Sequence, residues 1–553
     1  MTGQLIECVP NISEGRDEKI IAAITNVVGQ VEGVKLLDVD PGKATNRTVI
    51  TFVGEPQAVC EAAFRLMKKA AELIDMSKHK GEHPRMGATD VCPLIPIAGI
   101  TNDETADYAN KLAARVGSEL KIPVYLYEHS QPNKSRSNLS VIREGEYEGF
   151  FEKIKKPEWK PDFGLQEFNA RSGATVIGAR DFLVAFNANL NSTSVRRANS
   201  VAFDVRENGR LVKNEKSEDV RVSGKCKSLK AIGWYIEEYG IAQVSMNLTN
   251  INITPVHIAF DACVECAANR GMRVTGSELV GLIPLKAMIE AGKYFLKKQK
   301  LSSGVSVGEL IRIAIKSMGL DELAPFDPEK KIIEFMLQDK KSFPLLNMNL
   351  REFADETASE SPAPGGGSIA AYLGSLGISL GTMVANLSAH KKGWEDRFEE
   401  FSNWAEKGQV LKDNLLMMVD EDTRAFNKIM DAFKLPKNTD EEKEARKKTI
   451  HDTTINAIEV PFKVMKLAFD SMTIIKAMAE NGNPNSVSDA GVGALCARSA
   501  VMGAHLNVKI NAAGLKDKSS IENILKEAEQ IEQNAVAMEK EILTIVNQKI
   551  LAS

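Results

Sequence analysis

The chain has 553 residues, of which 43% are hydrophobic and 26% charged, a composition that excludes fibrous and disordered proteins. Its formal net charge of −4 gives no broad basic field, which argues against a nucleic-acid partner and favours small-molecule chemistry. The length is too great for one hydrophobic core, so we expect about two to four domains.

The first 20 residues lack the basic region and apolar run of a secretory signal, so we expect a cytoplasmic protein. Two segments then repeat the order strand, helix, strand, strand, helix, strand, which is the split βαβ arrangement. The ranges in the first segment are 5–10, 17–30, 34–40, 46–54, 56–74 and 91–97. Those in the second are 182–190, 193–207, 231–240, 241–250, 255–271 and 272–279.

This repeat predicts two α/β subdomains, at 1–178 and 179–335, with a ligand cleft between them, because domain junctions favour pockets. A charged turn within 336–345 is the predicted linker. Beyond it the sequence shows long helical periodicity, and its prolines stand at apparent helix boundaries. Residues 346–553 are therefore predicted to form an all-α bundle.

One uncharged stretch, 365–390, is long enough to cross a membrane. Small residues recur in it at every fourth position, at Gly377, Gly381 and Ala385, which suits close contact between helices. No second span and no flanking aromatic belt accompany it. We therefore predict a buried bundle helix and no membrane association.

Residues 79–90, "HKGEHPRMGATD", concentrate histidine and charge in a stretch punctuated by Gly and Pro. Gly81 and Pro84 interrupt regular structure, so His83 is predicted to lie on a loop entering the next strand. Its imidazole could act as a general base near neutrality, with a carboxylate to orient it. The alternative is a loop histidine bonded to a backbone carbonyl.

Two acids, Asp38 and Asp40, end the strand at 34–40 and share one of its faces. Asp40 could orient a base or could simply form the following turn. In the C-terminal part, "VDEDTRAF" places Asp422 four residues from Met418 and from Phe426, on an apolar helix face. A carboxylate there is costly unless it is functional or paired.

Two further stretches in the C-terminal part precede helices. The run "APGGGS" holds Gly365, Gly366 and Gly367, whose free N–H groups make an anion site, or alternatively a tight bend for helix packing. It lacks the lysine of a P-loop, so nucleotide binding is weakly supported. Asn485 and Asp489 in "GNPNSVSDAG" stand at a helix start, where capping alone is an alternative.

Together these blocks resemble the formimidoyltransferase-cyclodeaminase family over essentially the whole chain. The transferase likeness lies in "CVPNISEG", "LLDVDPGKATNRTVITFVG", "DMSKHKGEHPRMGATDVCPLIPI", "GATVIGARDFLVAFNANL" and "GSELVGLIPLKA". The cyclodeaminase likeness lies in "APGGGSIAA", "VDEDTRAF", "KLPKNTDEE" and "NPNSVSDAGVGA". The resemblance implies an α+β region of two ferredoxin-like βαββαβ subdomains, followed by the helical-bundle domain.

The resemblance also implies roles for particular residues. His83 would be the transferase general base with Asp40 as its partner, and Asp422 would transfer protons in the cyclodeaminase. Gly365, Gly366, Gly367, Asn485 and Asp489 become candidates for the cyclodeaminase pocket. Folate contacts fall on two stretches that we expect to be loops: Gly164, Leu165, Gln166, Glu167, Phe168, Asn169, Ala170, Arg171, Ser172 and Gly173, and Gly224, Lys225, Lys227, Lys230, Ile232 and Gly233. The second stretch matches the family only at its "IG" end.

The implied substrates are N-formimidoyl-L-glutamate and tetrahydrofolate, the latter as co-substrate and in polyglutamylated form, with no metal. The implied assembly is a homo-oligomer, an octamer in the family. Two alternatives stay open from the sequence: a folate-binding scaffold with a non-catalytic bundle, and a transferase that takes N-formyl-L-glutamate.

Overall fold

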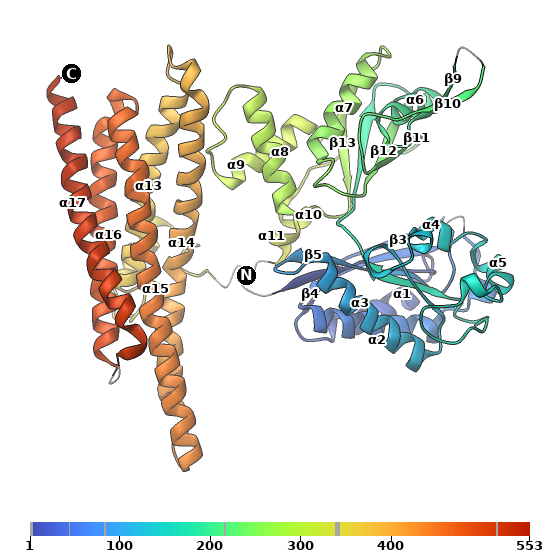
Figure 1. The fold of residues 1–553 in the computed structure, drawn as a ribbon, viewed down its shortest axis with the longest axis horizontal. Helices are drawn as coiled ribbons and strands as arrows, with labels where there is room; N and C mark the ends of the chain where they lie inside the picture. The colour runs from blue at the N-terminus through green and yellow to red at the C-terminus, as the bar shows by residue number, and fades with distance from the viewer. Residues whose placement is uncertain are drawn as a thin grey trace. The chain divides into compact units, whose positions relative to one another are not determined.

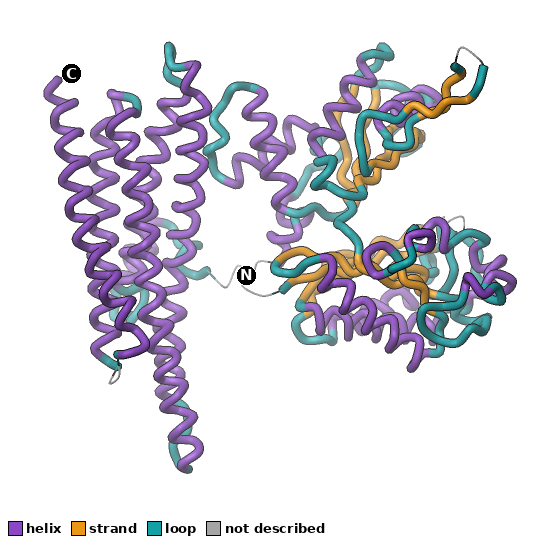
Figure 2. The backbone as a smooth tube through the Cα atoms, in the orientation of Figure 1, coloured by secondary structure: helices purple, strands orange, loops and turns teal. Residues whose placement is uncertain are grey.

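The computed structural model describes residues 4–43, 45–81, 84–214, 217–337, 343–515 and 518–552. Its internal contacts divide the chain into two compact units, which we call unit 1 (1–287 and 318–337) and unit 2 (288–317 and 338–553). Figure 1 traces the chain through both, and Figure 2 shows that strands belong to unit 1. Residues 338–342 of the predicted linker lie outside the described residues. The predicted boundaries at 178 and 335 stay predictions.

The first sheet of unit 1 has seven strands in the order β1-β4-β2-β5-β7-β6, with β3 beside β4. They are β1 (Leu5–Cys8), β2 (Asn11–Ile12), β3 (Val34–Gly42), β4 (Arg47–Gly54), β5 (Thr89–Ala98), β6 (Val124–Leu126) and β7 (Thr175–Ala179). The associated helices are α1 (Glu18–Gly29), α2 (Pro56–Leu73), α3 (Asn102–Arg115), α4 (Leu139–Ile142) and α5 (Glu146–Lys153). The order strand, helix, strand, strand, helix, strand occurs along the chain as β1, α1, β3, β4, α2 and β5, and β6 and β7 extend the sheet beyond these elements.

Strand alternation gives the first sheet two different faces. Ile6, Phe52 and Leu94 point into a core that includes the buried sides of α1, α2 and α3. The alternate residues, among them Glu7 and Thr51, point to the opposite face. The helices therefore cover one face and leave the other for a ligand.

The second sheet of unit 1 has four antiparallel strands in the order β11-β12-β8-β13. They are β8 (Val184–Leu190), β11 (Leu229–Ile236), β12 (Ile241–Leu248) and β13 (Val274–Val280), with helices α6 (Val195–Val205) and α7 (Val256–Ala268). A separate hairpin consists of β9 (Arg210–Lys213) and β10 (Asp219–Val222). Two short helices, α10 (Pro328–Lys331) and α11 (Ile333–Leu337), end the unit.

Unit 2 is helical, which confirms an α/β region followed by a helical domain. Its helices are α8 (Leu285–Lys298), α9 (Val307–Met318), α12 (Leu350–Thr357), α13 (Gly366–Ala389), α14 (Phe398–Lys434), α15 (Asp440–Asn481), α16 (Val487–Ala513) and α17 (Glu522–Ala552). Helix α13 is apolar and long enough to cross a membrane, yet 61% of its most apolar window is buried. It packs against α14, α15 and α16, as a bundle helix is expected to do. Gly377 allows this packing, because a Cβ there would lie 2.9 Å from the carbonyl oxygen of Gly493 on α16.

Candidate active sites

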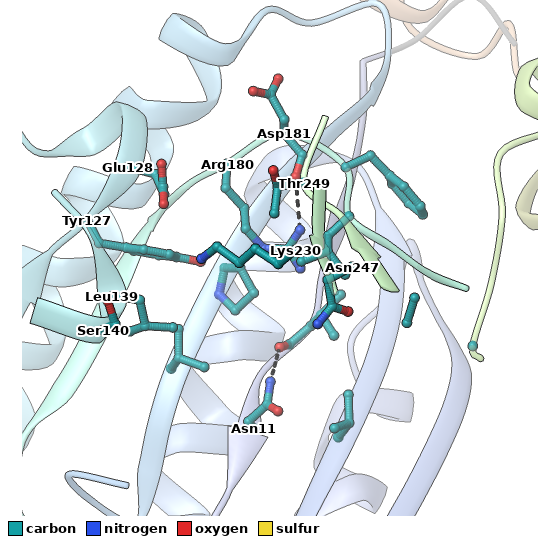
Figure 3. A pocket seen from close by; sticks show the side chains of 18 of the residues that line it. Asn11, Tyr127, Glu128, Leu139, Ser140, Arg180, Asp181, Lys230, Asn247 and Thr249 are labelled. Atoms are coloured by element: carbon teal, nitrogen blue, oxygen red, sulfur yellow. Dashed lines mark hydrogen bonds between the residues drawn. The ribbon is translucent and has the colours of Figure 1, made fainter. Parts of the chain in front are cut away.

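Unit 1 contains a cavity of about 1070 Å³ between its two sheets. The helix-free face of the first sheet supplies Glu7, Thr51 and Pro93, while Lys230 and Asn247 come from the second sheet. Figure 3 shows Lys230 extending across the cavity toward Tyr127. This volume is large for a small-ligand site, so the cavity can hold a ligand of folate size or two substrates together.

The pairing of strands fixes where the side chains lie on the cavity face of the first sheet. Asp40 lies opposite Val49 on β4, and Val49 lies opposite Asn11 on β2. Four residues further along β4, Val53 lies opposite Glu7 on β1. Asp40 and Glu7 thus occupy rows about 13 Å apart, at roughly 3.3 Å per residue.

The motif that suggested a general base flanks this cavity. His83 and Glu82 lie outside the described residues, but Pro84 lines the cavity. His79 is held on both ring nitrogens: Nε2 lies 2.9 Å from the Asn46 carbonyl oxygen, and Nδ1 accepts from Arg85 Nε at 3.2 Å. His79 is therefore a structural histidine of the loop.

Both acids of the L-D-V-D motif, Asp38 and Asp40, line the cavity. Asp38 is half-buried, and burial together with the nearby Asp40 carboxylate raises its pKa. The predicted pairing of Asp40 with His83 stays a prediction, because His83 lies outside the described residues.

The cavity also contains a charge cluster that sequence reasoning missed. Asp90, whose side chain is 1% exposed, accepts from the Met86 backbone N–H at 2.9 Å, from Arg47 at 3.2 Å and from Arg143. Burial lowers the pKa of Arg47 to about 10. One carboxylate therefore positions two guanidinium groups that both line the cavity, which makes them suited to a substrate carboxylate. The sequence pointed to this cluster only through Asp90, which lies within the stretch "HKGEHPRMGATD".

A second missed residue is Glu7, on the central strand β1. It lines the cavity although the residue is only 3% exposed. Burial raises its pKa from 4.5 to about 7, and the Arg180 charge opposes this rise. Among the residues that the structure describes, none donates a hydrogen bond to its carboxylate. A buried carboxyl group in a cleft with a perturbed pKa is a functional-site candidate.

This pKa makes Glu7 a source of instability in the ligand-free protein. A raised folded-state pKa means that stability is fully present below the unfolded value of 4.5 and is lost as the pH rises through about 7. The corresponding cost at pH 8 is about 3 kcal/mol. Glu7→Gln is therefore expected to raise the melting temperature in calorimetry at pH 8, and less so at pH 5. The exposed Glu32→Gln should change neither, and a pH-independent effect of Glu7→Gln would contradict the account.

The first predicted folate segment, Gly164–Gly173, supplies no residue that lines the cavity. It lies against the histidine motif instead: the Ser172 carbonyl accepts from Ala88 N–H at 2.9 Å, and Tyr147 donates to the Ala170 carbonyl. At Gly173, with φ of +64°, a Cβ would lie 2.1 Å from the Met86 carbonyl oxygen. The segment thus supports the loop that carries the motif.

The second predicted folate segment is divided between two places. Lys230 lines the main cavity, whereas Gly224 and Lys225 line a smaller cavity of about 600 Å³. Lys225 also pairs with Glu265. Residues 224–228 precede β11, which begins at Leu229, two residues before the strand predicted at 231–240. Lys230, Ile232 and Gly233 therefore lie on a strand and not on a loop. Ile232 is 53% exposed on that strand, and Gly233 accommodates the backbone of Asn199.

In unit 2 the acidic motif of α14 separates into three different environments. Asp420 is buried and accepts from the backbone N–H groups of Leu345 and Leu346 at 3.0 and 3.2 Å. Glu421 pairs with Arg424. Asp422 faces the start of α13, where it accepts from Ser368 Oγ at 3.2 Å. Of the three acids, Asp422 alone joins the glycine run.

Burial raises the pKa of Asp422, against the opposing hydrogen bonds from Ser368. The glycine run provides the space for this carboxylate: a Cβ on Gly367 would lie 2.1 Å from Asp422 Oδ1. Gly366 faces Asn507 of α16, which lies 3.4 Å from a Cβ built there. The structure thus brings Asp422 together with the glycines at the start of α13.

Asn485 and Asp489 do not join this group within the chain. The neighbouring Asn483 N–H donates to Ser388 Oγ at 2.8 Å, at the far end of α13. Ser368 and Ser388 are 20 residues apart in the helix, or about 30 Å at 1.5 Å per residue. Helix α16 begins at Val487, so both residues stand at its start, as predicted.

Comparisons with known proteins identify both parts. Family descriptions match at residues 5–180 (Formiminotransferase domain, N-terminal subdomain), 185–338 (Formiminotransferase domain) and 349–530 (Formiminotransferase-cyclodeaminase). A formimidoyltransferase-cyclodeaminase of Mus musculus is 42% identical over 93% of each chain.

Two shorter relatives match parts of the chain. A glutamate formimidoyltransferase of Streptococcus pyogenes serotype M1 is 41% identical over 53% of this chain and 94% of its own. A methenyltetrahydrofolate cyclohydrolase of Methylorubrum extorquens is 38% identical over 37% of this chain and 98% of its own. From the near-complete match to the mouse protein, this chain belongs to the formimidoyltransferase-cyclodeaminase family.

Proposed function

We propose that this bifunctional enzyme carries out two successive steps on tetrahydrofolate. Unit 1 transfers the formimidoyl group from N-formimidoyl-L-glutamate to N5, and unit 2 closes the product to 5,10-methenyltetrahydrofolate with release of ammonia. The observation that carries this proposal is the match to the mouse enzyme over 93% of both chains. Tetrahydrofolate is the co-substrate, because it carries the one-carbon unit itself.

For the transfer, N5 attacks the formimidoyl carbon, and the tetrahedral intermediate expels the glutamate amine. His83 takes the proton from N5 and returns one to the leaving amine, while Asp40 orients its ring. Two features support this assignment: Asp40 and Pro84 both line the cavity of unit 1. Holding both substrates in one cavity contributes much of the rate, because it converts a bimolecular encounter into a positioned one.

For the cyclisation, N10 attacks the same carbon and ammonia leaves. Asp422 carries the proton toward the departing nitrogen. Its support is the raised pKa, which favours a protonated donor, and its position beside Ser368 at the start of α13. The free N–H groups of that helix start, including those of Gly366 and Gly367, hold the carboxyl group or an anionic part of the folate.

Other features of the family are proposed for this chain as well. The antiparallel order β11-β12-β8-β13 with α6 and α7 supports a ferredoxin-like second subdomain. The proposed assembly is a cytoplasmic homo-oligomer, an octamer as in the family, acting on polyglutamylated folate. Lys225, Lys227 and Lys230 are the proposed partners of glutamate carboxylates.

One assay tests the function against its rivals. The pure protein is mixed with tetrahydrofolate and formimidoylglutamate, and methenyltetrahydrofolate absorbance and free ammonia are followed together. The bifunctional enzyme produces both in equal amounts. Folate binding with neither product supports the scaffold, and turnover only with formylglutamate supports the formyl donor.

A further inference from the structure

Glu7 has a feature that the proposed mechanism leaves unused. Glu7 lines the cavity of unit 1, and only 3% of the residue is exposed. Among the described residues, none donates a hydrogen bond to its carboxylate. Buried carboxylates are regularly hydrogen-bonded or paired, because leaving them unpaired is costly. Because Glu7 lines the cavity, its donors come from water or from a ligand that enters and displaces that water.

The surroundings of Glu7 indicate the shape of that ligand. Its cross-strand neighbours Val53 on β4 and Ile95 on β5 are buried and do not line the cavity. Further along the same face, Val9, Val91 and Pro93 do line it, so the carboxylate lies at one end of an apolar strip of the cavity surface. Such a strip suits a flat heterocycle with its polar edge turned toward the carboxylate.

The charges near Glu7 indicate which groups of the ligand face its carboxylate. The charge that acts on Glu7 is that of Arg180, whose Nη1 also donates to the Asp181 carbonyl at 2.9 Å. With a cation already near, a neutral pair of N–H donors complements the carboxylate better than a second cation does. Two parallel donors also match the two oxygens of one carboxylate.

We infer that Glu7 binds the pterin ring of tetrahydrofolate, with its carboxylate accepting hydrogen bonds from the 2-amino group and from N3–H. This inference rests on the proposed transferase function of the cavity. It deepens that function by assigning the group that fixes the pterin and thereby places N5.

The spacing along the sheet agrees with this orientation. The rows of Glu7 and Asp40 are about 13 Å apart along β4, from four residues at roughly 3.3 Å each. Glu7 and Asp40 lie on strands at opposite sides of β4, so they are also offset across the sheet by two strand spacings of about 4.8 Å each. This separation leaves room for a bicyclic pterin beside Glu7. The reactive N5 then points away from Glu7, toward the Asp40 end of the cavity.

The test compares two ligands on three proteins. Wild type, Glu7→Gln and Glu7→Leu are titrated by calorimetry at pH 8 with tetrahydrofolate and with its analogue lacking the 2-amino group. Wild type is expected to prefer tetrahydrofolate by about 10- to 100-fold, as for a hydrogen bond to a charged group. Glu7→Leu should bind both ligands equally, and Glu7→Gln should show a smaller preference than wild type. The KM for formimidoylglutamate should stay within about threefold in Glu7→Gln.

Several outcomes overturn the inference. It fails if wild type binds both ligands equally, if Glu7→Leu keeps the full preference, or if Glu7→Gln raises the KM for the donor while tetrahydrofolate binding is unchanged. Glu32→Gln is the charge-matched control outside the cavity. A cooperative thermal unfolding transition, measured on each variant by calorimetry, reports an intact unit 1. Failure of the proposed function has a different signature, because wild type then shows no transferase turnover at all.

Discussion

His83→Ala is expected to lower the transferase rate by about 100- to 10,000-fold, the usual contribution of a positioned general base. Tetrahydrofolate binding should change little, because the apolar strip beside Glu7 and the Asp90 cluster are untouched. In wild type the rate at saturating tetrahydrofolate should rise with pH near neutrality, as an imidazole loses its proton, and this rise should be absent in the variant. Steady-state kinetics across pH 5.5 to 8.5 measures both effects.

Two controls separate chemistry from structure in this experiment. His129→Ala removes another histidine of unit 1, one with a 38% exposed side chain, and should leave the rate unchanged. Cyclisation of supplied 5-formimidotetrahydrofolate should also be unchanged in His83→Ala. Wild-type transferase turnover in His83→Ala would refute the assignment of the base.

Asp422→Asn is expected to lower ammonia release from 5-formimidotetrahydrofolate by a similar factor, because the amide cannot exchange a proton. The transferase rate should stay unchanged, since its cavity lies in unit 1. In wild type the cyclisation should slow as the pH rises through the raised pKa of Asp422, because the proton donor is then lost. Ammonia release is the direct measurement.

A substitution at Gly367 tests the role of the Asp422 carboxyl group without changing Asp422 itself. Gly367→Ala should lower cyclisation as well, because the new Cβ would lie 2.1 Å from Asp422 Oδ1 and displace it. Gly503→Ala on α16 is the matched helix glycine: its Cβ would meet Ala370 at an ordinary 3.4 Å. Loss of both activities in Asp422→Asn with the fold intact would contradict separate sites.

The sequence predicted those features that depend on local pattern. The period of apolar residues located the helices of unit 2, and the apolar neighbours Met418 and Phe426 singled out Asp422. The strand order of both α/β segments also followed from short alternating runs. The sequence did not predict that β6 and β7 extend the first sheet. Strand β7 pairs in parallel with β5 and β6, which lie far from it along the chain, so no local pattern indicates the pairing.

Glu7 shows why part of the site could not be predicted. In "LIECVP" a glutamate between apolar residues is typical of a half-exposed strand, with the polar side chain in water. Only the second sheet, more than 170 residues later, turns that face into a cavity wall. For Asn485 the local sequence suggested a site residue that the structure does not bring to the site. Its helix start resembles that at Gly366, but the two helix starts lie at opposite ends of α13.

The central claim is that two independent proton-transfer sites act in sequence on one carbon. It is tested most directly by mixing His83→Ala protein with Asp422→Asn protein and following methenyltetrahydrofolate formed from formimidoylglutamate and tetrahydrofolate. The account predicts that neither variant alone forms the product and that the mixture does, because 5-formimidotetrahydrofolate made by one protein is cyclised by the other. A mixture as inactive as the double variant would contradict it.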